Sequence, residues 1–381
     1  MKKLLLALLT LPLVAAAAAQ LSGHGYLITA VARTYLQGNV TASIDDHTAF
    51  DTRAVAAGAA QPWPLAARYP VPLDAAFAQD LEANDAIAFL VAHQGELASE
   101  TYFGNYGPDS KTNSFSMAKT VVTLLLGMAI EQGIIDGLSQ PLVEWLPEFN
   151  DQPFAQSATI GSLSSMTSGY EWDEHYYSPL SPTVKLLYGS DVEQFVLDGE
   201  FTREPDSYFY YSSASTQLLA VALTRALRQS AKAESLSAYL STQLWQPLGM
   251  NADALWHLDN SGLELAYCCL NSNVRNFARI GQLMLQEGEW RGQQLVPKSF
   301  VNGMVTPGIV SYYGNSTWLR HDGSPDYYFL SGHLGQYVIV VPDHDLVIVR
   351  LGRSMPHIRP VEKLNDYVEY ALALIDQDVG G

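Results

Sequence analysis

Ser116 and Lys119 lie three residues apart in "SFSMAKT" (114–120), at the start of an apolar run. On a helix, residues at i and i+3 share a face about 5–6 Å apart at Cβ, so the amine reaches the hydroxyl. The first helical turn also favours negative charge on the serine. Desolvation by the apolar run would lower the lysine pKa and leave a neutral base. The spacing predicts a nucleophile with its base, although a helix cap beside a surface lysine has the same pattern.

Two further motifs carry reactive or polar groups. In "YFYYSSASTQLLAVAL" (208–223), Tyr211 precedes a Ser-Ser turn that opens a helix, where a phenol near a lysine can act as acid or base. In "LSGHLGQYVIVV" (330–341), Gly335 would let a substrate approach the strand edge. The Gln336 N–H could then pair with that of Ser116 as an oxyanion hole. The aromatics could equally be core, and His333 a packed or capping histidine.

The elements that must position these groups can be read from periodicity. Residues 86–106 predict a hairpin around "QGE", and 336–352 a second strand pair turning at "PD". Between them the pattern is mostly helical from about 121 to 290, and 360–377 forms an amphipathic helix. Strands near both ends predict an α+β fold, an antiparallel sheet flanked by helices with an inserted all-helical lobe.

The N-terminus "MKKLLLALLTLPLVAAAAAQ" has the pattern of a secretory signal, with cleavage expected after Ala19. Its apolar run is too short to span a bilayer core of about 30 Å, although an N-terminal anchor is the alternative. We therefore expect an exported protein, periplasmic or secreted, with no stable membrane insertion once the signal is removed. Residues 20–84 lack a sustained period and predict an extended, wrapping segment before a domain at 85–375.

The composition excludes several classes of partner. Loss of Lys2 and Lys3 with the signal would move the formal charge from −18 to −20, which disfavours nucleic acid and anionic lipid. The only cysteines, Cys268 and Cys269, are adjacent; we expect two buried thiols, with a vicinal disulfide as the alternative. Motifs of metal sites such as H-E-x-x-H and C-x-x-C do not occur in the sequence.

Taken in order, S-x-x-K, Y-S-x and H-x-G resemble the serine β-lactamase and penicillin-binding-protein superfamily. The likeness is to its class C-like branch, which includes family VIII carboxylesterases, D-aminopeptidases and 6-aminohexanoate-dimer hydrolases. The stretches 164–177, 267–301 and 332–352 resemble the last group in particular. The resemblance covers most of residues 85–375 and implies the β-lactamase/transpeptidase-like fold.

The resemblance also implies roles for individual residues. Ser116 would be the acylated nucleophile, Lys119 its base and Tyr211 the proton shuttle. Substrate contacts would come from Tyr176 (or the adjacent Tyr177), Ser213, His333 and Gly335. Two residues depart from the lactamase pattern: Ser213 stands where asparagine is usual, and His333 replaces the lysine of K-T-G. Both departures favour an esterase or amidase over a dedicated β-lactamase.

The leading hypothesis is an exported serine hydrolase that cleaves small esters or amides through an acyl-enzyme, with no metal and no organic cofactor. A D,D-peptidase or β-lactamase is a second hypothesis, and a non-catalytic penicillin-binding-like module a third. An α/β-hydrolase is disfavoured because G-x-S-x-G does not occur. We expect a monomer or a weak homodimer.

Overall fold

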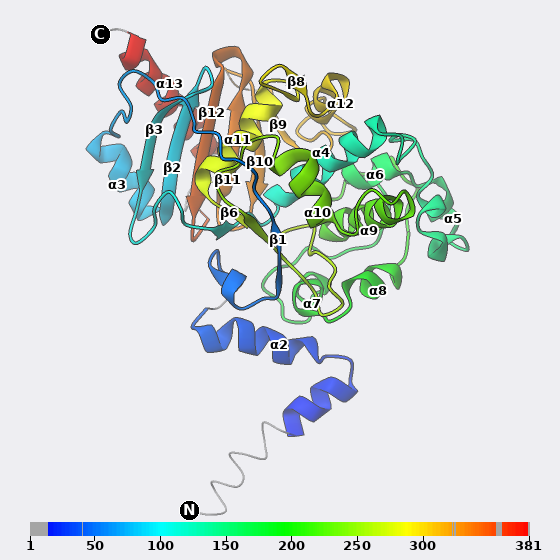
Figure 1. Ribbon diagram of the computed structural model, residues 1–381. Helices are drawn as coiled ribbons and strands as arrows, with labels where there is room; N and C mark the ends of the chain where they lie inside the picture. Colours follow the sequence, from blue (N-terminus) through cyan, green and yellow to red (C-terminus); the bar gives the residue numbers. More distant parts are fainter. Residues whose placement is uncertain (1–13, 40, 322, 324, 356–359, 380–381) are drawn as a thin grey trace, which may run out of the picture.

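The computed structural model describes residues 14–39, 41–321, 323, 325–355 and 360–379 (Figure 1). The largest sheet in this part of the chain has six antiparallel strands in the order β3-β2-β12-β11-β10-β9. Its strands are β2 (Ala86–His93), β3 (Glu96–Tyr102), β9 (Trp318–Arg320), β10 (Tyr327–Gly332), β11 (Gln336–Val341) and β12 (Leu346–Gly352). The hairpins predicted at 86–106 and 336–352 are both confirmed, and β12 pairs with β2, which joins the two ends of the chain in one sheet.

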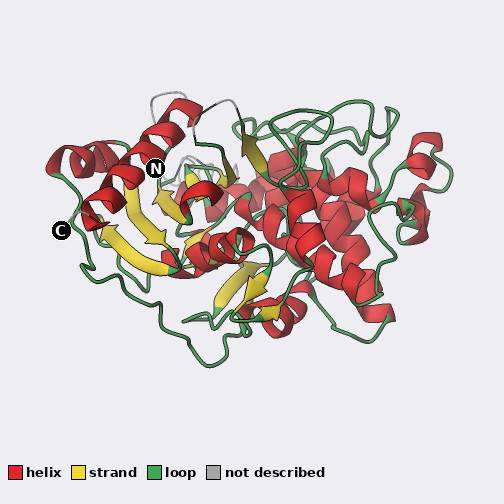
Figure 2. Ribbon diagram, turned by 90° about the horizontal axis from the view of Figure 1, so that it is seen from above, coloured by secondary structure: helices red, strands yellow, loops and turns green. Residues whose placement is uncertain are grey.

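Helices cover both faces of this sheet, as Figure 2 shows. On one face, α3 (Ala75–Ala83) and α13 (Pro360–Val379) pack through aromatic side chains, with Phe77 stacked on Tyr370 at 3.5 Å between ring centroids. On the other face lies α11 (Val274–Leu285), where a Cβ on Gly281 would come within 2.7 Å of Val338. Because both faces are covered, β2 is buried along almost its whole length and reads as a continuous apolar run.

The remaining helices gather beside one edge of the sheet (Figure 1). The helix α4 (Met117–Glu131), predicted after "SFSMAKT", is buried along almost its whole length and packs against α9 (Ser213–Gln229) and β10. The others are α5 (Pro153–Ser157), α6 (Ile160–Ser164), α7 (Pro182–Tyr188), α8 (Val192–Leu197), α10 (Leu236–Leu240) and α12 (Lys298–Met304). Since α11 packs on β11 and β12, we propose that the helical lobe, expected at about 121–290, ends before α11.

A smaller sheet lies between the large sheet and the helices. Its order is β1-β5-β6-β4, formed by β1 (Thr52–Val55), β5 (Ala254–His257), β6 (Leu270–Ser272) and β4 (Thr112–Asn113). A short ribbon pairs β7 (Glu289–Trp290) with β8 (Gln293–Gln294). Because β4 leads directly into α4, this sheet sets the position of the turn at Ser116.

The N-terminal segment contains α2 (Tyr26–Arg33) as well as β1 and α3, and α2 lies beneath α7 in Figure 1. Residues 1–13 of the expected signal lie outside the described residues. Among the helices that are described, none combines the length and apolar character needed to cross a membrane.

Candidate active site

Ser116 is the N-cap residue of α4 and is presented by a constrained turn. Phe115, just before it, has φ +45°, a left-handed conformation that a bulky residue rarely adopts. Its N–H donates to Asn113 Oδ1 at 2.9 Å, and the Ser114 N–H donates to the Leu270 carbonyl at 3.0 Å. The small sheet therefore holds the turn, and the Ser116 side chain stays partly exposed while its neighbours are buried.

Lys119, one turn along α4, is buried at 1% exposure. Its Nζ donates to Ser116 Oγ at 2.9 Å, to Ser213 Oγ at 3.2 Å and to the Tyr267 carbonyl at 2.9 Å. All three acceptors are neutral. Burial lowers the Lys119 pKa to about 8, against an opposing effect of the Glu174 charge. A substantial fraction of this amine is therefore neutral near physiological pH, as a general base requires.

Tyr211 also lies beside Lys119, whose Nζ is 5.0 Å from the centroid of the Tyr211 ring. Burial, followed by the Glu174 charge, raises the Tyr211 pKa above its usual value, and a hydrogen bond with Ser116 acts in the opposite direction. The phenol is therefore protonated at neutral pH and is able to donate a proton. The Tyr211 ring packs against Trp318 at 5.4 Å and Tyr313 at 6.1 Å between centroids.

Glu174 connects several groups of the site, and the sequence reasoning missed it. Its Oε1 accepts from Ser213 Oγ at 2.5 Å and from the Tyr176 hydroxyl at 2.8 Å. Its Oε2 accepts from the Ser213 N–H at 2.8 Å and the Trp172 indole at 2.7 Å. The resulting chain runs from Glu174 through Ser213 to Lys119. The only signal was the position of Glu174 two residues before Tyr176 in "DEHYY".

The segment from His333 to Gln336 follows β10, whose end lies beside the turn at Ser116. A Cβ on Gly332 would lie 2.2 Å from the Ser114 carbonyl oxygen, so glycine permits the end of β10 to approach this turn. Gly335, with φ +77°, has its open side occupied by the Arg350 guanidinium, and a Cβ there would lie 2.2 Å from Nη1. Glycine at this position therefore also makes room for Arg350, and the approach of substrate at Gly335 stays a prediction.

Gln336 begins β11 and is fully buried. Its side-chain amide donates to the His333 carbonyl at 3.1 Å and to the Gly352 carbonyl at 2.6 Å. The same side chain accepts from the Gly352 N–H at 3.1 Å. These bonds hold the turn between β10 and β11 against the end of β12.

His333 lies among aromatic rings, 5.1 Å from Tyr176, 5.5 Å from Phe115 and 6.0 Å from Tyr177 between centroids. Burial lowers the His333 pKa to about 4, so the imidazole is neutral at pH 7. Tyr177 is 72% exposed, whereas the Tyr176 hydroxyl is tied to Glu174. Of the two adjacent tyrosines, Tyr176 is therefore the one fixed within the site.

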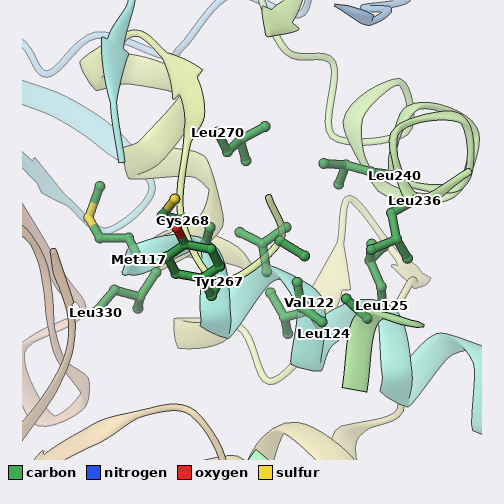
Figure 3. Close-up of a cluster of buried hydrophobic side chains, with 14 of the residues drawn as sticks. Met117, Val122, Leu124, Leu125, Leu236, Leu240, Tyr267, Cys268, Leu270 and Leu330 are labelled. Atoms are coloured by element: carbon green, nitrogen blue, oxygen red, sulfur yellow. The ribbon is translucent and has the colours of Figure 1, made fainter. Parts of the chain in front are cut away.

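Tyr267 and Cys268 complete the wall beside α4, and Figure 3 shows both close to Met117 at the start of that helix. Cys268 and Cys269 are joined by a vicinal disulfide, so the expectation of two thiols is wrong. The sequence could not distinguish two thiols from a disulfide, because adjacent cysteines are compatible with both. The Tyr267 carbonyl, next to this disulfide, accepts the hydrogen bond from Lys119.

A cavity of about 330 Å³ opens onto Ser116. Ser213, Tyr176, Tyr177 and His333 also line it, so the cavity brings together residues from the three sequence motifs and the 170s loop. Much of its remaining wall comes from α2, from α7 and from the segments adjacent to these two helices. No group of three or more His, Cys, Asp or Glu residues in the described part of the chain is arranged to hold a metal ion.

Comparison with known proteins places this geometry in context. A model of the β-lactamase family matches residues 73–373. The 6-aminohexanoate-dimer hydrolase of Paenarthrobacter ureafaciens is 28% identical over an alignment of 246 residues that covers 60% of this chain and 59% of that protein. The chain thus matches less than two thirds of the length of this curated relative.

Two solved structures share the fold. A candidate 6-aminohexanoate-dimer hydrolase from Bacillus anthracis superposes with a TM-score of 0.76 at 23% identity, covering 87% of this chain and 94% of that one. A family VIII carboxylesterase superposes with a TM-score of 0.62 at 15% identity, covering 78% of this chain and 95% of the other. The family match spans most of the sequence, and these structures have the same α+β architecture. The chain therefore belongs to the serine β-lactamase and penicillin-binding-protein superfamily.

Proposed function

We propose that this protein is a serine hydrolase that cleaves small esters or amides through an acyl-enzyme on Ser116. The observation that carries the proposal is the buried Lys119 amine, 2.9 Å from Ser116 Oγ and hydrogen-bonded to neutral groups. A lysine in such surroundings has a lowered pKa and can accept the serine proton.

The proposed reaction begins when Ser116 Oγ attacks the substrate carbonyl carbon and its proton passes to Lys119 Nζ. The backbone N–H groups of Ser116 and Gln336 would stabilise the oxyanion of the tetrahedral intermediate. Tyr211 then donates its proton to the leaving group and recovers one from Lys119. In deacylation the same groups remove a proton from water, which attacks the acyl carbon and releases Ser116.

Hydrolysis of p-nitrophenyl butyrate by wild type and Ser116→Ala tests the proposal, together with labelling by a fluorophosphonate. We expect a burst of p-nitrophenol and labelling in wild type, and loss of both in the variant. Wild-type protein that neither turns over the ester nor reacts at Ser116 would refute the assignment.

A β-lactamase or D,D-peptidase remains the second candidate because the family contains such enzymes. The neutral His333 disfavours it, since that residue offers no cation for the carboxylate of a β-lactam. His333→Lys tests the point: we expect nitrocefin turnover to rise several-fold relative to butyrate ester turnover. Wild-type protein that prefers nitrocefin would reverse the order of the two candidates.

We also propose that residues 1–19 direct export, because the segment has the charged, apolar and small-residue parts of a signal. N-terminal sequencing of the protein from its native host checks this proposal. A mature chain that begins at Gln20 is expected, and one that retains Lys2 and Lys3 would contradict it.

A further inference from the structure

The cavity at Ser116 has an apolar wall that the catalytic chemistry does not explain. This wall includes Leu27, Ala30, Val31 and Thr34 of the N-terminal segment. Their spacing of i, i+3, i+4 and i+7 places them on one face of α2 and at its C-terminal end. Val184 and Leu187 of α7 line the same cavity. Two helices, more than 140 residues apart in sequence, thus line a single, mostly apolar cavity.

Polar contacts attach α2 to the region around α7. Thr34 Oγ1 and the Tyr188 hydroxyl are hydrogen-bonded at 2.6 Å in a buried position. The Tyr26 hydroxyl donates to the Pro179 carbonyl at 3.1 Å. These bonds fix the α2 face relative to the cavity, and the wall is therefore a built part of the site.

Charged side chains do not occur among the described residues that line this cavity. His333, which lines this cavity, is neutral at pH 7 because burial lowers its pKa to about 4. The nearby Glu174 has both carboxylate oxygens occupied by hydrogen bonds from Ser213, Tyr176 and Trp172. A charged substrate group would lose its hydration here and gain no ionic partner.

The cavity also lies on a defined side of the nucleophile. Ser116 and Ser213 line it, whereas Tyr211 is not among its lining residues and packs toward Trp318. In the proposed reaction Tyr211 protonates the leaving group, which must therefore lie on the Tyr211 side of Ser116. The cavity is left for the acyl part of the substrate.

We propose that the space between α2 and α7 is an acyl pocket for an uncharged aliphatic chain, and that the α2 face at Leu27, Ala30 and Val31 determines its specificity. This proposal rests on the proposed function. An acyl group that ends in an ammonium, as in the dimer of 6-aminohexanoate, is a poor fit for this pocket. The preferred substrates are esters or amides of neutral, medium-chain acids.

The test compares two p-nitrophenyl esters whose acyl chains have nearly the same shape, heptanoate and 6-aminohexanoate, at pH 7 after subtraction of uncatalysed hydrolysis. We expect kcat/KM to be at least about a hundredfold higher for heptanoate, since it buries a methyl group where the other would bury a charge. From acetate to hexanoate, kcat/KM should rise about fourfold per methylene. Equal values for the matched pair, or a flat chain-length series, would overturn the acyl pocket and leave the esterase assignment standing.

Variants of α2 locate the effect. Val31 is 45% exposed and lines the cavity, whereas Ile28 is 42% exposed on the same helix and does not. Val31→Asp should lower kcat/KM at least tenfold more for heptanoate than for acetate, and Ile28→Asp should leave both values unchanged. Val31→Ala, which keeps the wall uncharged, should change the same ratio about threefold in the same direction, and it serves if the aspartate variant does not fold.

The possible outcomes separate the two proposals. Equal effects of Val31→Asp and Ile28→Asp on the heptanoate-to-acetate ratio would refute the role of α2. Absence of turnover with every ester, together with absence of labelling at Ser116, would refute the proposed function and the acyl pocket with it.

Discussion

Two buried cations, Lys119 beside Ser116 and Arg350 against the turn at His333–Gln336, differ in what they can do. Lys119 is 1% exposed and donates to two hydroxyls and a carbonyl. Arg350 is fully buried and donates to the carbonyls of Leu334 at 3.1 Å and Gly335 at 2.7 Å, and to that of Asn84. Burial lowers the pKa of both residues.

The difference lies mainly in the chemistry of the two side chains. The Lys119 amine, with a pKa of about 8, loses its proton within the physiological range. A guanidinium keeps its proton in proteins. Burial thus favours a neutral amine at Lys119, whereas Arg350 stays charged and holds the turn at Leu334 and Gly335 through its hydrogen bonds.

Removal of the base should have the largest effect. Lys119→Met keeps the packing of α4 and should lower the acylation rate by about 10⁴-fold, because nucleophile and base act as a unit. The burst phase with p-nitrophenyl butyrate measures this rate, and thermal unfolding checks that the variant is folded. Wild-type acylation in a folded Lys119→Met protein would exclude Lys119 as the base.

Removal of the Arg350 guanidinium should lower the stability of the fold. Arg350→Met leaves several buried carbonyls without a donor and should reduce the free energy of unfolding by about 3 kcal/mol in urea titrations. Arg353→Met is the control, since Arg353 is largely exposed and its ion pair with Asp85 contributes about 1 kcal/mol or less. An equal loss of unfolding free energy in Arg350→Met and Arg353→Met would contradict the stabilising role of Arg350.

The pH dependence of activity separates the two cations further. Below the Lys119 pKa of about 8, the neutral fraction falls tenfold per pH unit, so kcat/KM for a neutral ester should fall in parallel and level off above that pH. Measurement of kcat/KM from pH 5.5 to 9.5 tests this expectation. The Arg350→Met variant, where it is folded, should show the same fall of kcat/KM at acidic pH. A fall of kcat/KM with its midpoint near pH 6 would show that the titrating base is a group other than Lys119.

Glu174→Gln should have the smallest effect on activity, and its most specific effect should be on the pH dependence. The Glu174 charge raises the Lys119 pKa, so its removal should move the acidic limb to lower pH. We expect kcat to fall about tenfold as well, because an amide cannot accept all four hydrogen bonds. Glu171→Gln, on the exposed side of the same loop, is the matched control. A limb that stays in place would show that Glu174 does not act on Lys119.

Much of the fold could be predicted because its signals are local. The hairpins at 86–106 and 336–352 alternate strand runs with turn residues, and the helix predicted to open at the Ser-Ser turn after Tyr211 is α9. The grouping of Ser116, Lys119 and Tyr211 came from the resemblance, since the residues are separated in sequence. Their roles in catalysis remain proposals.

Other features gave no local signal. Glu174 is an ordinary acidic residue in an irregular loop until the loop folds over the start of α9. The contact of Gly335 with Arg350, fifteen residues away in sequence, has no local signal either. The α2 face was overlooked because the segment 20–84 lacks a sustained apolar period, and its four residues acquire meaning only opposite α7.

The sequence by itself determined the chemical groups, their order and the local elements that carry them, because helix spacing and strand alternation depend on near neighbours. Tertiary structure decided the lowered pKa of Lys119, the neutral state of His333 and the shape of the cavity. Each of these depends on removal of water by segments far apart in the chain, and desolvation is a property of the packed interior rather than of any short stretch of residues.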